Sequence, residues 1–308
     1  MAATSRPSGM ESALPTPTDN GLFGPESVTW KVMASPAASV GTATAVLVQM
    51  LHPRVVRLIA QASTFERNPE LRSRLTAQYG MSTIFGDTAT AEWAGETLRK
   101  LHSRMKAIDI ETGEEYAADE PDLLLWVHAT IPWAMLRAYE RWGEPLTAAE
   151  KDRYVLEQRE AARLVGLDPE VAPGSIAELD AYMASMMPKL AYTAEAGRIR
   201  AIMVPRKLPR SGAELVTRLM SLAAVDLLTP EMRELYGYWW GPVQRGMLAA
   251  ASNGILRTAA KKATPESLIP QLREQAHAHA FGAKALRINK EIREQVGQTP
   301  VQLDAADA

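Results

Sequence analysis

Apolar residues along this 308-residue chain recur at steps of three and four, and few stretches alternate apolar and polar residues. Steps of three and four place side chains on one face of an α-helix, whereas a half-buried strand alternates at every second residue. Prolines, glycines and capping residues divide the periodic stretches into units of helix length. The sequence therefore predicts an all-α fold, arranged as a single multi-helix globular domain.

Start and stop signals locate the helices. Asn68 followed by Pro69 opens a helix that should end near Gly80. Thr147 and Ser175 each precede a glutamate by three positions, which is the pattern of a capping box. No linker is long enough to separate two folding units. The expected helices span about 39–52, 68–80, 88–111, 119–142, 147–164, 176–187, 211–226, 229–239, 242–258 and 264–294, the last with a break near Gly282.

The two ends of the chain are more polar than its middle. Residues 1–22 are rich in Pro, Ser and Thr and lack the apolar run of a secretory signal, so we expect a disordered arm. Residues 23–297 form the expected helical domain, and 298–308 a polar tail. The longest uncharged stretch, 32–53, contains proline, glycine and several hydroxyl side chains, which favours a buried helix over a transmembrane segment. We therefore expect a cytoplasmic protein.

Composition removes several classes of function. The chain has no cysteine, which excludes disulfides, zinc–cysteine sites, cysteine nucleophiles and thiolate-held haem or iron–sulfur clusters. Lys plus Arg number 34 against 36 for Asp plus Glu, a formal net charge of -2, so nothing indicates a nucleic-acid partner. P-loop, nucleophile-elbow, dinucleotide-binding and HExxH motifs are also missing.

Histidines are the main candidates for metal chemistry. His52, His102 and His128 each lie in apolar surroundings. One such histidine is most often a core residue bonded to a carbonyl, but three in a helical protein without cysteine favour a haem or metal site more strongly. His277 and His279 are two apart and cannot hold one ion from a regular helix, so we expect them at the surface or partly packed.

Two further groups allow a functional and a structural interpretation. Arg72 and Thr76 are four apart and share a helix face, so both could reach one ligand; alternatively, an exposed arginine lies beside a threonine that bonds back to its own helix. The methionines near 183–187 and the Trp239–Trp240 pair either fill the core or line an apolar substrate cavity.

An ordered series of segments resembles the oxygenase MpaB / latex-clearing protein (rubber oxygenase) family. The resemblance covers about residues 24–190, and the remaining third is assigned to the same domain by its helical composition alone. The segments are GPESVTWKVMASP (24–36), LVQMLHP (47–53), RSRLTAQYG (72–80) followed by FGD, LRKLHSRM (98–105) and YAADEPDLLLWVHAT (116–130).

The resemblance implies a helical fold that encloses a pocket for one haem b. By the match of LRKLHSRM, it implies His102 as the ligand of the haem iron, with His128 as the alternative cofactor-binding residue. It implies that Arg72 and Thr76 line the distal side, where Arg72 would bind iron-bound oxygen or a haem propionate. Rubber-cleaving members can carry a distal lysine where this chain has Leu75, so we expect no lysine-capped state. Their glutamate base has no assigned counterpart here.

The resemblance also implies a haem-dependent oxygenase that uses dioxygen on a small apolar substrate. An unsaturated terpenoid or lipid fits better than polyisoprene, because neither an export signal nor a membrane anchor is seen. Two other classes stay open. One is a non-haem metal enzyme that uses His52, His102 or His128 with a carboxylate, and the other is a helical ligand-binding protein without catalysis. Nothing in the sequence fixes the oligomeric state.

Overall fold

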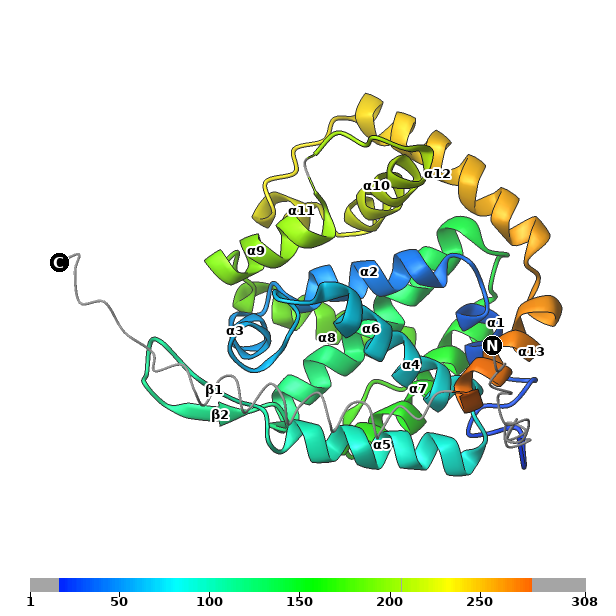
Figure 1. The fold of residues 1–308 in the computed structure, drawn as a ribbon, viewed down its shortest axis with the longest axis horizontal. Helices are drawn as coiled ribbons and strands as arrows, with labels where there is room; N and C mark the ends of the chain where they lie inside the picture. Colours follow the sequence, from blue (N-terminus) through cyan, green and yellow to red (C-terminus); the bar gives the residue numbers. More distant parts are fainter. Residues whose placement is uncertain (1–16, 206, 279–308) are drawn as a thin grey trace, which may run out of the picture.

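A computed structural model describes residues 17–205 and 207–278. The prediction of an all-α fold is confirmed, with one short hairpin as the regular exception in this part of the chain (Figure 1). The helices are α1 (Val28–Met33), α2 (Ala38–Gln49), α3 (Pro53–Ala62), α4 (Pro69–Phe85), α5 (Thr88–His102), α6 (Pro121–Trp142), α7 (Ala148–Val165), α8 (Ile176–Met186), α9 (Ala194–Met203), α10 (Gly212–Asp226), α11 (Pro230–Leu235), α12 (Pro242–Lys262) and α13 (Pro265–Ala278).

The core is built on the contact between α2 and α6. Both helices are apolar around most of their circumference, which suits them to a fully enclosed position. Gly41 of α2 permits the close approach, because a Cβ there would lie 3.2 Å from Met135 Cα and 3.3 Å from Ala138 Cβ. Trp126 of α6 is fully buried beside this contact. Most of the other helices pack around the pair in one continuous core.

Helices α4 and α5 form a second layer, with α5 along the lower edge in Figure 1. Asn68 caps α4, as expected, but the helix continues past Gly80 to Phe85. Nothing lies within 4 Å of the position that a Cβ on Gly80 would take, so this glycine neither crowds nor breaks the helix. Leu75 of α4 and Ala94 of α5 are buried at the contact between them.

One carboxylate fixes the start of α5. Asp87 accepts hydrogen bonds from the Thr90 N–H (2.9 Å) and from the N–H and hydroxyl of Thr18 (both 3.1 Å). Its Oδ2 also lies 3.5 Å from Nε2 of His277, which is on α13. These hydrogen bonds hold the pKa of Asp87 far below its usual range against the opposing effect of burial. The cap therefore joins residue 18, α5 and α13, and α13 packs along α4.

Two expectations for the first half of the chain are wrong. The helix that begins at Thr88 ends at His102, and a hairpin of β1 (Lys106–Ile108) and β2 (Glu115–Ala117) follows, with Lys106 opposite Ala117. Strands of three residues are too short for their alternation to stand out. Pro53 does not merely end a helix, because it occupies the first turn of α3, a position that needs no backbone donor.

Other expectations lie partly or wholly outside the described residues. These are the arm before residue 17, the tail 298–308, His279 and the helix beyond 278. Residues 17–22 are described and contact the start of α5 through Thr18 and Asp19. Helix α9 was not expected from the sequence.

No single helix of the described part is long and apolar enough to cross a membrane. The α2–α3 pair reaches that composition only when taken together, and its two helices meet at 102°. Both helices contribute buried side chains to the core.

We expect Gly41→Ala to lower the free energy of unfolding by about 1–3 kcal/mol, because the added methyl group would overpack the α2–α6 contact. Gly246→Ala is the matched control, since no atom lies within 4 Å of its Cβ position in α12. It should stabilise the protein by about 0.5–1 kcal/mol through helix propensity. Urea unfolding of both variants measures the difference. Equal effects would show that the α2–α6 contact is not tight.

Candidate functional site

Arg72 and Thr76 lie one turn apart on α4 and bond to each other. Arg72 Nη1 donates to Thr76 Oγ1 (2.6 Å), and the Thr76 hydroxyl donates to the Arg72 carbonyl oxygen (3.0 Å). The shared helix face predicted from the spacing is therefore present, and so is the back-bonding of the structural alternative. The hydroxyl proton is used within the helix. Thr76 consequently holds the guanidinium by accepting its hydrogen bond. In this arrangement the hydroxyl has no proton left to donate to a ligand.

Arg72 is a cation in surroundings that disfavour charge. Burial lowers the pKa of its guanidinium, although the side chain keeps part of its accessible surface. Among the described residues no carboxylate forms an ion pair with it. A guanidinium carries five N–H donors in a planar fork, and only one is used on Thr76. The remaining donors are suited to an anionic or strongly polar group.

His102 is the last residue of α5 and is half-buried. Burial lowers the pKa of its imidazole to about 4, and the nearby positive charge of Arg72 adds to the effect while Asp119 opposes it. The ring is therefore neutral at physiological pH. Its Nδ1 is shielded from solvent and has no hydrogen-bond partner in the described part of the chain. A neutral imidazole with an unpaired nitrogen has the lone pair that a metal ligand needs.

The packing of α4 against α5 brings these groups together. Leu75 and Ala94 are buried between the helices, and Leu71, Tyr79 and Leu101 pack against them. Because His102 directly follows Leu101, this contact brings the imidazole within electrostatic range of Arg72. Leu75 itself faces α5, so the position at which relatives can carry a distal lysine belongs here to the helix–helix contact.

His128 lies elsewhere, within α6. It is 7% exposed, and burial lowers its pKa to about 4. Pro132 follows four residues later and has no N–H, so the His128 carbonyl lacks its usual helical donor. Burial is the only cause of the His128 shift, whereas the charge of Arg72 also acts on the pKa of His102. The structure thus brings Arg72, Thr76 and His102 together and leaves His128 in the α6 layer.

Of the other described histidines, His52 also has a shielded Nδ1 without a hydrogen-bond partner in the described part of the chain, but no effect of Arg72 acts on it. His52 caps α3, is 8% exposed and lies 6.0 Å from the ring of Trp126; burial lowers its pKa. The His277 side chain is buried, with Nδ1 2.7 Å from the Arg273 carbonyl oxygen. In residues 17–205 and 207–278, no three His, Cys, Asp or Glu side chains gather as a metal-binding group.

The sequence interpretation missed two residues near the candidate site. Tyr79 is seven positions after Arg72 and three after Thr76, so helical spacing could have indicated it; burial raises the pKa of its hydroxyl. Asp119 acts on His102 from beyond the hairpin, and no local pattern signals that approach. Of the two interpretations of the methionines near 183–187, packing in the core is confirmed for Met183 and Met186.

Comparison with protein families assigns the class. A family model described as "ER-bound oxygenase mpaB/B'/Rubber oxygenase, catalytic domain" matches residues 30–258. The chain therefore belongs to the MpaB/rubber oxygenase family and carries its oxygenase catalytic domain. The match extends past the expected limit near 190 into α12. No curated protein and no solved structure matches the chain.

Stability of the protein without added cofactor should fall as pH decreases from about 6.5 to about 4. His128 ionises with a pKa of about 4 when folded and near 6.5 when unfolded, so the unfolded chain binds protons first. Above pH 6.5, neutral His128 makes its full contribution to the free energy of unfolding. By pH 4 the free energy of unfolding has fallen by on the order of 3 kcal/mol. Urea unfolding at pH 7 and pH 4.5 measures it, and His128→Gln should flatten the dependence. If the stability of His128→Gln fell with pH as steeply as that of the parent protein, His128 would not be the residue responsible.

Proposed function

We propose that this protein is a haem-b-dependent oxygenase that uses dioxygen on a small apolar, unsaturated substrate of terpenoid or lipid type. The observation that carries the proposal is a neutral imidazole with an unpaired ring nitrogen, His102, within electrostatic range of a guanidinium that has no carboxylate partner, Arg72. Both residues lie inside the segment that matches the oxygenase family.

The residues present fit a haem. A haem iron needs one neutral imidazole nitrogen from the protein, and His102 offers one without the cost of removing a proton. A cluster of several ligands is not required. The negatively charged propionates of a haem, or an oxygen atom near its iron, would satisfy the N–H donors that Arg72 leaves free. Thr76 would keep the guanidinium in position by accepting from Nη1.

Space for such a group is supported by a combination of two properties. Burial shifts the pKa values of Arg72 and His102, yet both side chains keep accessible surface. Partial accessibility leaves both side chains able to meet a bound group. Leu71, Tyr79 and Leu101 lie in the same contact region and keep the surroundings largely apolar. That environment suits an apolar substrate.

The chemistry would be divided between cofactor and protein. When bound, the haem supplies the activation of dioxygen. His102 would hold and orient it, Arg72 would donate hydrogen bonds on the side where negative charge develops, and the apolar helix contacts would exclude water. Because the chain belongs to the rubber oxygenase family, we favour cleavage of a C=C bond as the reaction.

Purified protein supplied with haem should show a Soret band, and His102→Ala should weaken or abolish it. His128→Ala is the matched control, because it removes an equally neutral buried imidazole from another layer of the fold. It should leave the axial-ligand spectrum largely intact. Circular dichroism confirms that both variants fold. Loss of the band in His128→Ala alone would transfer the ligand assignment to His128.

Arg72→Ala should retain haem but bind cyanide at least about tenfold more weakly in the ferric protein, since one charge-assisted hydrogen bond contributes about 1.5–3 kcal/mol. Thr76→Val keeps the guanidinium and should have a smaller effect. Spectroscopic titration gives both affinities. Unchanged cyanide binding in Arg72→Ala would remove this residue from the ligand-binding side.

The two alternative classes are separated by porphyrin extraction and metal analysis. Stoichiometric iron without porphyrin would favour a non-haem enzyme. Protein that stays colourless after reconstitution would favour a ligand-binding role without catalysis.

A further inference from the structure

Helix α12 exposes one face along its whole length. Eighteen residues make five turns of an α-helix, so Val243 and Lys261 point in the same direction. The positions between them on this face are exposed as well. The first half is apolar, with Val243 73% and Met247 70% exposed, and the second half carries Arg257 and Lys261. We call this surface the outer face of α12: Val243, Met247, Ala250, Gly254, Arg257, Thr258 and Lys261.

One further exposed apolar side chain precedes this half of the helix. Trp239 lies four residues before Val243 and is 73% exposed, and Trp239, Val243 and Met247 are among the four most exposed large apolar side chains of the described chain. Trp239 is therefore not a core residue, in contrast to the packing alternative from the sequence, whereas Trp240 packs against Tyr238 with ring centroids 5.1 Å apart. Exposed large apolar side chains this close together along the chain are typical of an interaction site.

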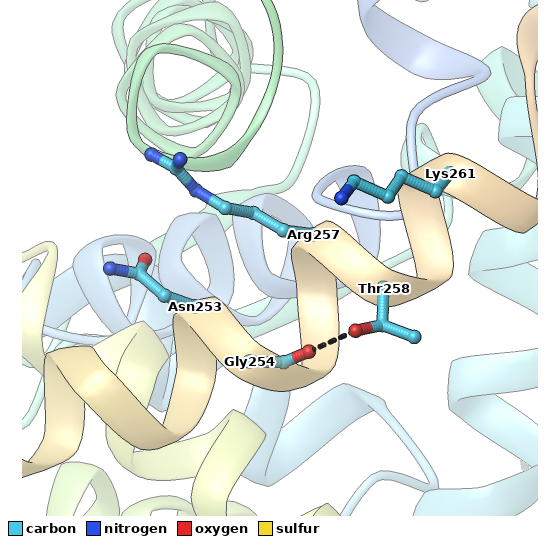
Figure 2. Close-up of a pocket in the computed structure, with 5 residues that line it drawn as sticks. All are labelled: Asn253, Gly254, Arg257, Thr258 and Lys261. Carbon is cyan, nitrogen blue, oxygen red and sulfur yellow. Dashed lines mark hydrogen bonds between the residues drawn. The ribbon is translucent and has the colours of Figure 1, made fainter.

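The second half borders a hollow, and Figure 2 draws the five residues that line it: Asn253, Gly254, Arg257, Thr258 and Lys261. Its volume is about 370 Å³, and its lining comes from α12 alone. Gly254 leaves a gap in the helix face, because nothing lies within 4 Å of its Cβ position. Arg257 and Lys261 border the gap and form no ion pair with a carboxylate in the described residues. Asn253 Oδ1 is shielded from solvent without a partner there.

We propose that the outer face of α12, with Trp239, docks on an anionic lipid surface. The apolar half would enter the boundary between head groups and acyl chains, where tryptophan is favoured. Arg257 lies ten residues after Met247, a rise of about 15 Å along the helix. A tilted α12 thus inserts its first half and places Arg257 and Lys261, with the hollow between them, at the phosphate level.

Charge complementarity selects the occupant. The chain as a whole has a net charge of -2, but α12 itself contains four cations and no carboxylate. Cations next to exposed apolar side chains are suited to anionic head groups. A second copy is a poorer occupant: antiparallel pairing of two outer faces would set Arg257 and Lys261 against Val243 and Met247, which would desolvate charges without pairing them.

The docking face is separate from the candidate haem site, since α12 and α5 lie on opposite edges of the molecule in Figure 1. The inference does not depend on the haem, and its test needs no activity. Full-length protein is sedimented with phosphatidylcholine vesicles and with vesicles that also contain phosphatidylserine. We expect binding to the anionic vesicles, weakened by salt.

Met247→Glu should abolish this binding, and Arg257→Gln and Lys261→Gln should each weaken it about fivefold, the effect of about 1 kcal/mol per cation. Val171→Glu is the matched control, because Val171 is also an exposed apolar residue (56% exposed) but lies on another part of the surface. This variant should bind vesicles as the parent does. Quenching by brominated lipids should report insertion in the parent and decline in Trp239→Phe.

Failure of the parent to bind anionic vesicles would overturn the proposal, as would binding that survives Met247→Glu. A dimer in solution that Met247→Glu converts to a monomer, without vesicle binding by either, would assign the face to a second copy instead. Far-ultraviolet circular dichroism of each variant confirms that loss of binding does not reflect loss of fold.

Discussion

The contact between α4 and α5 is the constraint on which the candidate site depends. Leu75 and Ala94 bury the interface, and only because they do so does the positive charge of Arg72 act on His102. That charge and the surrounding protein keep the imidazole neutral. The same packing uses Leu75 as a contact residue, so a hydrophobic interaction between two helices also decides which side chains remain free for a ligand.

Much of the fold could be predicted because its signals are local. Thr147 and Ser175 cap their helices as their spacing indicates, and the Thr147 capping box is complete. The misses have physical causes. Pro53 is compatible with either the end or the first turn of a helix. The hairpin depends on Gly113, whose positive φ of 74° closes the turn. Strands of three residues give too little alternation to predict this hairpin from the sequence.

The candidate site could be predicted only in part. The bond between Arg72 and Thr76 follows from helical spacing, since residues four apart are neighbours. The proximity of His102 to Arg72 does not, because thirty residues and a change of direction between α4 and α5 separate them. Asp119 reaches His102 from beyond a hairpin that the sequence pattern did not reveal. Tertiary packing supplies such contacts. The family resemblance named Arg72 and His102 but neither their proximity nor Asp119.

Asp87 gives the helix that carries His102 an unusual dependence on distant parts of the chain. Its carboxylate anchors Thr18 near one end of the described chain and faces His277 near the other, while it caps α5 between them. Removing Thr18 or α13 would therefore take away a partner of Asp87 at the first turn of α5. Removing α13 would also take away its packing against α4. The contacts that support α5 therefore extend beyond the family match at 30–258 on both sides.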